Sequence, residues 1–393
     1  MKRFEIQPVL SSALPDVASF LRRWHDNQAE GSSVQHPARE DSLSIERRLR
    51  WLLVENPIIT DGSQHGFCIR DHLGIIRGLT LSFPAAFLAA DQRLLGLCSG
   101  SFFVEPQART LGYYLFKKYL SSPGYSFFFA TTCNANSGAL WGKLGGCAVP
   151  NSETEHILPL RLDIILPEFV AKNSSSEVAS GIARIFGRCA NPILQLLARK
   201  SAELTIEPCQ DWQKLSELFR RHRSADWITS DRSAEFLQWR YGQTSPHYPC
   251  DIYLFRDKRG NEGWFSLGNI IRGQQGQIRG SVLLDAIWPR EKMSFRDIFQ
   301  EILRLVAAEA DAIFFRPQPG IDYCEFSRWI IPRRSEAPRA FVITRKGDPL
   351  LAIASLDYDD SDYGTWVGHW SRPRGRSDPS QVVQERREAG PEP

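Results

Sequence analysis

The order of strands and helices predicted for the first part of this chain begins again near Leu204, roughly 200 residues later. Within each part, apolar residues either alternate as in a strand or recur at helical spacing, as Val17, Phe20 and Leu21 do. The second part repeats the order of the elements but not their residues, which indicates a degenerate internal duplication. The chain has 393 residues, more than one compact core usually organises, so we expect two domains.

Both series begin with one strand, two helices and three strands, and then alternate helix and strand. The first series is predicted at 3–9, 16–26, 42–54, 66–70, 75–83, 94–104, 107–120, 126–131, 134–144 and 157–162. The second is predicted at 204–207, 212–221, 233–241, 251–256, 263–271, 277–287, 295–309, 312–315, 323–329 and 340–345. This order predicts a mixed α/β fold (an α+β arrangement around a mixed sheet) in two domains, residues 1–162 and 203–365.

Residues 163–202 fit neither series and are expected to form a linker with one helical segment. That segment runs from Val178 to Lys200 and is predicted to be interrupted near Asn191-Pro192. Its apolar residues share one face, with basic residues along it. Such a helix can lie on a membrane surface, although packing between two domains is the commoner arrangement for this pattern. Residues 366–393 are rich in Arg, Pro and Glu, and we expect disorder there.

Charge and composition argue against several kinds of partner. The 48 Lys and Arg against 45 Asp and Glu leave a formal charge of +3, whereas nucleic-acid binding needs a clear basic excess. No apolar run reaches the roughly 18 residues of a transmembrane helix, and the N-terminus turns polar too soon for a signal peptide. The eight Cys form no Cys-x-x-Cys pair, which predicts neither zinc nor disulfides and fits the cytoplasm. The acidic stretch 357–362 lacks the Gly and the distal Glu of a calcium loop, so no metal is expected.

The segment that indicates chemistry runs from Ser101 to Leu115. Its strand ends at Val104-Glu-Pro and turns directly into a helix that carries Arg109 and Gly112. The first N–H groups of a helix have no partner within the helix, and with the helix dipole they form an anion site suited to a pyrophosphate. Gly112 would let a phosphate approach the backbone closely.

This segment resembles the acyl-CoA-binding motif of the GNAT superfamily of N-acyltransferases, (Arg/Gln)-x-x-Gly-x-(Gly/Ala) after a hydrophobic-x-Pro lead-in. Arg109 and Gly112 match the motif, and Tyr114 stands where Gly or Ala is usual. Farther on, a segment that begins at Asn134 is similar to the family's second motif and has Trp141 where Tyr is common.

The resemblance implies two tandem GNAT-like modules and acetyl-CoA or another acyl-CoA as co-substrate. In the family, strands four and five separate, the pantetheine arm enters the gap, and an acceptor amine or hydroxyl attacks the acyl carbonyl directly. Glu105 is the first candidate for the base, with His65 and Glu55 as weaker candidates. The resemblance places cofactor binding at Phe103, Val104, Arg109, Thr110, Leu111, Gly112, Tyr113, Tyr114, Asn134 and Trp141.

The second series lacks the motif, because no Gly lies between Trp288 and Phe295, and a cofactor is not expected there. Its segment Trp239-Arg240-Tyr241 resembles a segment of tandem GNAT proteins. These side chains could shape an acceptor cleft, but a buried Trp with the Arg paired to a neighbour is the commoner arrangement.

The expected function is therefore acyl transfer, with acetyl as the first candidate group, to an amine or hydroxyl of a small molecule, sugar or peptide. Two alternatives remain. Some tandem GNAT-like proteins are aminoacyl transferases that use charged tRNA, which the balanced charge disfavours. A non-catalytic scaffold or ligand sensor is the other. A Tyr114 ring that fills the pyrophosphate site would favour the scaffold, and a ring turned outward would favour an enzyme.

Overall fold

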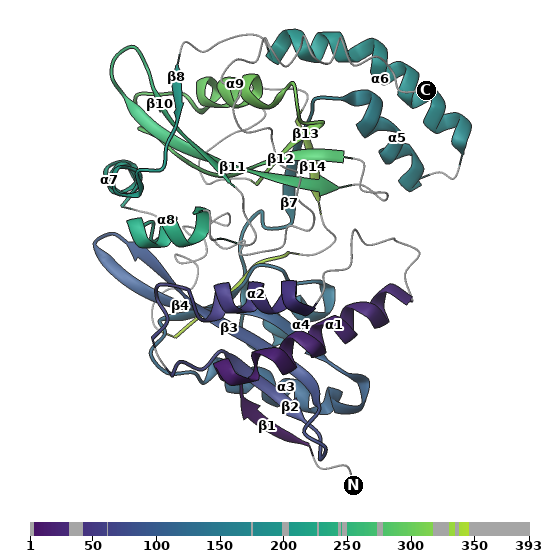
Figure 1. Cartoon of the computed structure of the whole chain (residues 1–393), viewed down its shortest axis with the longest axis vertical. Helices are drawn as coiled ribbons and strands as arrows, with labels where there is room; N and C mark the ends of the chain where they lie inside the picture. The colour runs from purple at the N-terminus through teal and green to yellow at the C-terminus, as the bar shows by residue number, and fades with distance from the viewer. Residues whose placement is uncertain are drawn as a thin grey trace.

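The structure, a computed structural model, describes residues 4–30, 42–60, 62–173, 176–198, 204–225, 228–242, 245, 250–272, 278–316, 330–334 and 338–345. Two sheets are stacked along the long axis of the molecule, and each carries helices on both faces (Figure 1). The predicted mixed α/β class in two modules is confirmed. None of the helices in these ranges has the length and apolar character needed to cross a membrane.

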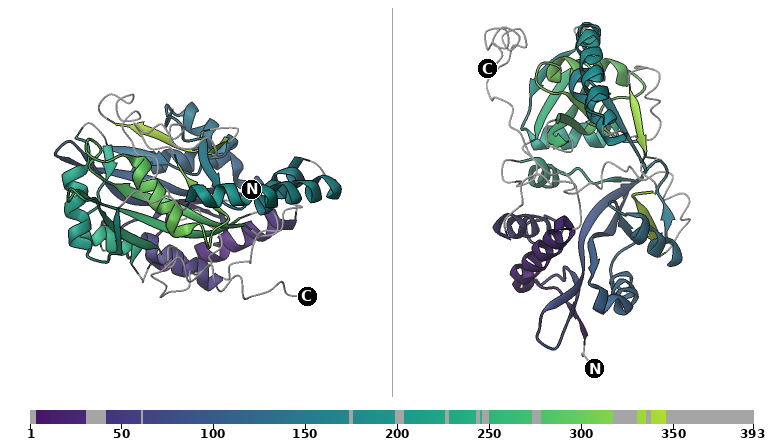
Figure 2. Two further views of the ribbon diagram at one scale, coloured as in Figure 1. Left: turned by 90° about the horizontal axis from the view of Figure 1, so that it is seen from above. Right: turned by 90° about the vertical axis from the view of Figure 1, so that its right-hand side faces the viewer.

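The first sheet contains, in spatial order, β1 (Glu5–Pro8), β2 (Gly66–Arg70), β3 (Ile76–Ala89), β4 (Gln92–Val104), β5 (Phe127–Ala130), β15 (Phe341–Thr344) and β6 (Cys147–Ala148). Neighbours are antiparallel except β4 and β5, which are parallel. β9 (Ile228–Ser230) pairs with the end of β3. Helices α1 (Leu14–Glu30) and α2 (Ser42–Leu53) pack on one face, and α3 (Gly112–Leu120) and α4 (Ala135–Lys143) on the other (Figure 2).

The second sheet contains, in spatial order, β14 (Ile331–Arg334), β7 (Thr154–Pro159), β13 (Ala312–Phe315), β12 (Ile278–Ile287), β11 (Glu262–Arg272), β10 (Asp251–Arg256) and β8 (Thr205–Pro208). Again one pair, β12 and β13, is parallel. Helices α7 (Trp212–His222) and α8 (Ala234–Tyr241) pack on one face, and α9 (Phe295–Val306) packs on the other. The second module therefore repeats the element order of the first.

The two modules exchange their closing strands. The strand expected to close the first series, β7, lies in the second sheet, where Ile157 is paired with Phe314 of β13 and with Ile331 of β14. In return β15, the last strand of the second series, lies in the first sheet between β5 and β6, with Phe341 paired with Ala130 and Ala148. The alternation of apolar residues predicted both strands, but it carries no information about which sheet receives them.

The segment between the modules is more helical than expected. It forms α5 (Leu162–Asn173), which was not predicted, and α6 (Glu177–Ala198), which is one helix. The predicted interruption near Pro192 is wrong, because the helix continues through this proline. The expectation that this segment packs between two domains is also wrong, since α6 lies against α5 and α9 at the end of the second module that is remote from the first (Figures 1 and 2).

The junction between the modules is built around two tryptophans at equivalent places in the two series. Trp51 of α2 and Trp239 of α8 stack with ring centroids 4.5 Å apart and planes 13° from parallel. Each indole Nε1 donates to the backbone oxygen of the other residue, at 3.1 Å in both directions. Both side chains are buried. The contact is reciprocal, as across the axis of a symmetric dimer.

The sequence analysis missed three short strands, and three of its expectations fall on residues that the structure does not describe. Strands β6, β9 and β14 were not predicted, because two to four residues carry too little periodicity. The helix expected at 323–329, the acidic stretch 357–362 and the tail 366–393 lie outside the described residues.

Candidate functional site

Strands β4 and β5 pair over only part of their length. Gly96, Leu97 and Cys98 of β4 are paired with residues 127–129 of β5. Beyond Cys98, β4 continues to Val104, and within the described part of the chain these residues pair with β3 alone. Among the described residues, no strand pairs with the edge of β4 that faces away from β3 between Ser99 and Val104. Such an edge is where an extended ligand can add to a sheet.

A β-bulge lies two residues beyond the last β4–β5 pair. Ser99 is paired with Ser82 and Ser101 with Leu81, which leaves Gly100 without a partner in β3. A Cβ on Gly100 would lie 3.3 Å from Cε1 of Phe83, so the site has little room for a side chain. The sequence analysis missed this bulge, although an isolated Gly inside a strand pattern is its usual signal.

Tyr119 of α3 holds the strands together at the point where they separate. Its hydroxyl donates to the backbone oxygen of Leu97 at 2.6 Å and lies 3.3 Å from that of Phe129 on β5. The side chain is fully buried, and burial raises the pKa of Tyr119 well above its ordinary value. The hydroxyl therefore stays protonated and remains a donor to the strands.

Replacing Tyr119 by Phe should lower the free energy of unfolding by about 1–2 kcal/mol, because a buried carbonyl loses its donor while the ring keeps its packing. Urea unfolding of Tyr119→Phe beside the parent chain measures this. A matched control is Tyr113→Phe, which changes an exposed tyrosine on the same helix. Equal losses in the two variants would contradict the role assigned to Tyr119.

The chain turns from β4 into α3 through a tight helical turn. The expected helix 107–120 is divided into a 3₁₀ helix, η2 (Pro106–Leu111), and α3. The amide of Ala108 donates to the oxygen of Glu105 at 2.9 Å, so not every N–H of the junction is free. Gly112 has ordinary helical backbone angles, and a Cβ there would point at Val104 Cγ2, 3.5 Å away. A Cβ would fit there in ordinary van der Waals contact, and a larger side chain would be directed at β4.

The start of α3 carries no negative charge. Neither η2 nor the first turn of α3 contains an acidic residue, and Arg109 and Thr110 are exposed. Arg109 makes no ion pair with any residue in the described ranges. Tyr114 is 58% exposed, and its ring packs edge-on against Tyr113, which lies under the ammonium of Lys117. The Tyr114 ring is thus turned outward.

The two residues of the second motif have partners within the fold. Trp141 is buried in the aromatic core beneath α3, where its ring contacts Phe116 and Tyr119. Asn134 is the N-cap of α4 and accepts hydrogen bonds from the amides of Asn136 and Ser137. Phe103 packs against Trp24 of α1, and Val104 packs beneath α3. The structure thus brings the first-motif residues 103–114 together at one end of β4, and it places Asn134 and Trp141 in supporting positions.

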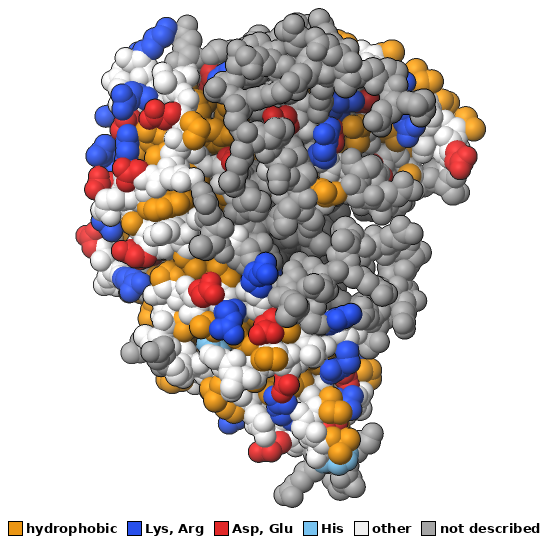
Figure 3. Space-filling view, in the orientation of Figure 1, with side chains coloured by type: hydrophobic (Ala, Val, Ile, Leu, Met, Phe, Trp, Pro, Cys, Tyr) orange, Lys and Arg blue, Asp and Glu red, His pale blue; other side chains and the backbone are white. Residues whose placement is uncertain are grey.

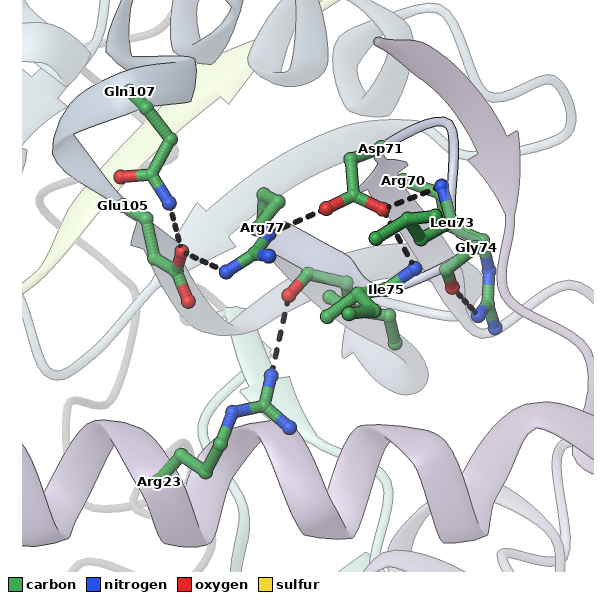
Figure 4. Close-up of polar contacts among 10 residues, drawn as sticks. Arg23, Arg70, Asp71, Leu73, Gly74, Ile75, Arg77, Glu105 and Gln107 are labelled. Atoms are coloured by element: carbon green, nitrogen blue, oxygen red, sulfur yellow. Dashed lines mark hydrogen bonds and ion pairs between the residues drawn. The ribbon is translucent and has the colours of Figure 1, made fainter. Parts of the chain in front are cut away.

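Glu105 belongs to an ion-pair network at the end of β4 (Figure 4). Its carboxylate lies 3.1 Å from Nη1 of Arg77 on β3, and Arg77 Nε lies 2.8 Å from the carboxylate of Asp71. The hydrogen bond to Asp71, followed by that to Glu105, raises the pKa of Arg77. Gln107 also donates to Glu105. These contacts fasten the end of β4 to β3.

The weaker base candidates lie elsewhere. His65 is buried, its Nε2 lies 2.9 Å from the hydroxyl of Ser11, and burial lowers the pKa of His65 below its ordinary value. The imidazole is thus a neutral part of the core at neutral pH. Glu55 is exposed, just after the end of α2.

The second module repeats the strand geometry of the site without its charge pattern. Residues 280–282 of β12 are paired with β13, and a bulge follows at Leu284, as at Gly100. The next residue, Asp285, is buried and ion-paired with Arg232 at 2.6 Å. The first turn of α9 contains Asp297, which opposes an anion at this helix start. Arg240, expected either to pair with a neighbour or to shape a cleft, is buried over the ring of Tyr241.

Comparison with known proteins identifies the fold. No family model and no curated protein sequence matches this chain. Among solved structures, a conserved protein of unknown function from Enterococcus faecalis, described as a probable N-acyltransferase, has a TM-score of 0.53 and 10% identity over 88% of this chain and 73% of its own. N-myristoyltransferase from Saccharomyces cerevisiae with bound myristoyl-CoA has a TM-score of 0.51 and 10% identity, covering 89% and 80%. A GCN5-related N-acetyltransferase from Anabaena variabilis has a TM-score of 0.50 and 13% identity, covering 86% and 72%. The chain therefore has the fold of the GNAT N-acyltransferases, in two tandem modules.

Proposed function

We propose that this protein is an acyltransferase that uses an acyl-CoA as donor and binds it at the end of β4 in the first module. The observation that carries the proposal is the geometry of this strand. β4 leaves β5 after Cys98, has a bulge at Gly100, and leads through Glu105 and η2 into α3. The first turns of η2 and α3 contain no acidic residue. An extended arm could pair with the edge of β4 that faces away from β3, while its anionic end meets the helix start.

We assign the parts of the donor site to the residues around this strand. Backbone amides between Arg109 and Tyr114 would hold the pyrophosphate, except that of Gly112, which donates to the oxygen of Arg109. The guanidinium of Arg109 would be the exposed cation. The backbone of β4 from Ser99 to Val104 would pair with the pantetheine arm. Asn134 and Trp141 would support the site by capping α4 and filling the core below α3.

The thioester of a bound acyl-CoA would supply an activated acyl carbonyl. The chain would contribute positioning, since the rigid pairing of β4 with β3 fixes where the other edge of β4 lies. Glu105 is not assigned as the base, because its carboxylate is ion-paired with Arg77 on the side of β3. The acceptor would be an amine or hydroxyl of a small molecule, sugar or peptide.

Reversing the charge of Arg109 should weaken acetyl-CoA binding by about tenfold or more at low salt, because the pyrophosphate would face a carboxylate at a helix start. Isothermal titration of Arg109→Glu measures the change. Lys118→Glu is the matched control, since it makes the same charge change at an exposed position in the last turn of the same helix. Equal affinities of the two variants would contradict this placement of the site. Gly112→Trp is a poorer test, because its side chain would enter β4.

The exposure of Tyr114 supports an enzyme over a scaffold, since the ring does not fill the helix start. Titration with acetyl-CoA and longer acyl-CoAs would define the donor. We place the protein in the cytoplasm, where thiols such as those of Cys68 and Cys147 stay reduced.

A further inference from the structure

Helix α6 exposes its large apolar side chains. Val178, Ile182, Ile185 and Phe186 are 74%, 64%, 65% and 66% exposed. Their spacing places them on one face of the helix, and the exposed Cys189 continues that face one turn on. Apolar side chains follow the edge of the molecule over α6 at the upper right of Figure 3. Scattered apolar residues are common on surfaces, but a continuous stripe along one helix marks an interaction site.

The opposite face of α6 carries Gly187, Asn191 and the buried Leu194, and it is fixed against α5. A Cβ on Gly187 would come within 2.4 Å of the backbone of Asp163, so only glycine fits there. Asn191 accepts a hydrogen bond from the amide of Leu162 at 2.8 Å and donates to the carboxylate of Asp163 at 2.6 Å. Arg161 binds the same carboxylate through Nε and Nη2, both at 3.1 Å.

These contacts determine the rotation of the helix. If α6 turned to bury its apolar stripe against α5, large side chains would replace Gly187 at a backbone contact, and the Asn191 hydrogen bonds would be lost. The outward direction of Ile182 and Phe186 is therefore built into the fold and does not reflect loose packing.

The charges beside the stripe are positive. Arg188 is exposed at the edge of the stripe, one turn beyond Ile185. Arg184 is also exposed and lies one turn before Arg188, nearer the side of the helix that faces α5. In the sequence, Glu177 at the start of the helix is the only acidic residue between 177 and 202. A helix with large apolar side chains on one face and arginines beside them matches the interface of an anionic bilayer, where the apolar groups enter the acyl boundary and the guanidinium groups meet lipid phosphates.

We propose that the α6 surface, defined by Val178, Ile182, Ile185, Phe186, Arg184 and Arg188, binds the face of a lipid bilayer that contains anionic headgroups. The helix lies in the plane of the membrane and does not cross it. The proposal is independent of the acyl-CoA site, because α6 belongs to the end of the second module remote from the first module.

Co-sedimentation of the full chain with vesicles tests this surface. We expect binding to vesicles of phosphatidylcholine with about a third phosphatidylglycerol, and weak binding to phosphatidylcholine alone. Ile182→Glu/Phe186→Glu should weaken binding by roughly tenfold or more, because the helix loses two apolar side chains that would enter the bilayer. Arg184→Glu/Arg188→Glu should weaken it similarly at low salt and less at high salt.

Matched controls make the same chemical changes elsewhere. Leu73→Glu alters an exposed leucine in the β2–β3 turn, and Lys118→Glu alters an exposed cation on α3. Neither should change vesicle binding. No binding by the parent chain would overturn the proposal, and so would equal binding by the α6 variants and the controls. The parent chain could instead fail to bind vesicles and form a dimer without lipid, which the Phe186→Glu substitution dissociates. That result would show that a second copy covers the stripe, and it would also overturn the proposal.

Discussion

Cleavage of the chain between α5 and α6 is expected to leave two fragments that stay bound to each other in native buffer. The reason is the exchange of closing strands. The first fragment contributes β7 to the interior of the second sheet, and the second contributes β15 to the interior of the first. Neither sheet is complete without a strand from the other fragment.

The loss on separation is large. Removing β15 would expose Phe341 and Val342, both buried, together with the edges of β5 and β6. Burial of two such side chains contributes about 3–6 kcal/mol, which is comparable to the whole stability of a typical domain, about 5–15 kcal/mol. Expressed alone, residues 1–173 or 176–393 should therefore not fold cooperatively.

A protease site inserted between residues 173 and 176 allows the test. Size-exclusion chromatography after cleavage should show one peak that contains both fragments, and denaturant should be needed to part them. Mixing the separately unfolded fragments should restore the circular dichroism of the intact chain. Separation of the cleaved fragments in native buffer, or cooperative unfolding of either fragment alone, would contradict the prediction.

Replacing Trp51 or Trp239 by Ala should lower the free energy of unfolding by about 3–5 kcal/mol, the usual cost of deleting a buried tryptophan. The two losses should not add, because each residue supplies half of the same stack and donates one of the two reciprocal hydrogen bonds. Denaturant unfolding of both single variants and the double variant measures the coupling.

Conservative variants separate the hydrogen bonds from the packing. Trp51→Phe and Trp239→Phe keep an aromatic ring but remove the donors, so each should cost at least about 1 kcal/mol. The control cycle pairs Trp239→Phe with Trp141→Phe, a buried tryptophan in a separate cluster of the first module. We expect the losses of unfolding free energy to be additive for the control pair. If they are also additive for Trp51 and Trp239, the stack does not couple the two modules.

Local patterns predicted much of the candidate site. The strand that ends at Val104 lies where it was expected, because strand alternation acts over a few residues. The helical stretch after Pro106 also lies where it was expected, but it is divided into η2, which carries Arg109, and α3, which begins at Gly112. The roles of single residues were harder to predict from the sequence. Glu105 was a candidate base from its position, but its partner Arg77 lies 28 residues away in sequence and on another strand. No sequence pattern around Glu105 predicts that ion pair.

The sequence by itself determined the order of the longer elements that the two series share and the strand-to-helix segment from Ser101 to Leu115, because propensity and periodicity depend on near neighbours. It missed α5 and the short strands β6, β9 and β14. Only the tertiary structure decided that β7 and β15 change sheets, that Trp51 meets Trp239 from 188 residues away, and that α6 turns its large apolar face outward. A pattern of apolar residues predicts a face that contacts other apolar groups, but it does not identify the partner of that face. The backbone of α5 leaves no room for a side chain at position 187, so the Gly187 face of α6 packs against α5 and the apolar stripe of α6 faces outward.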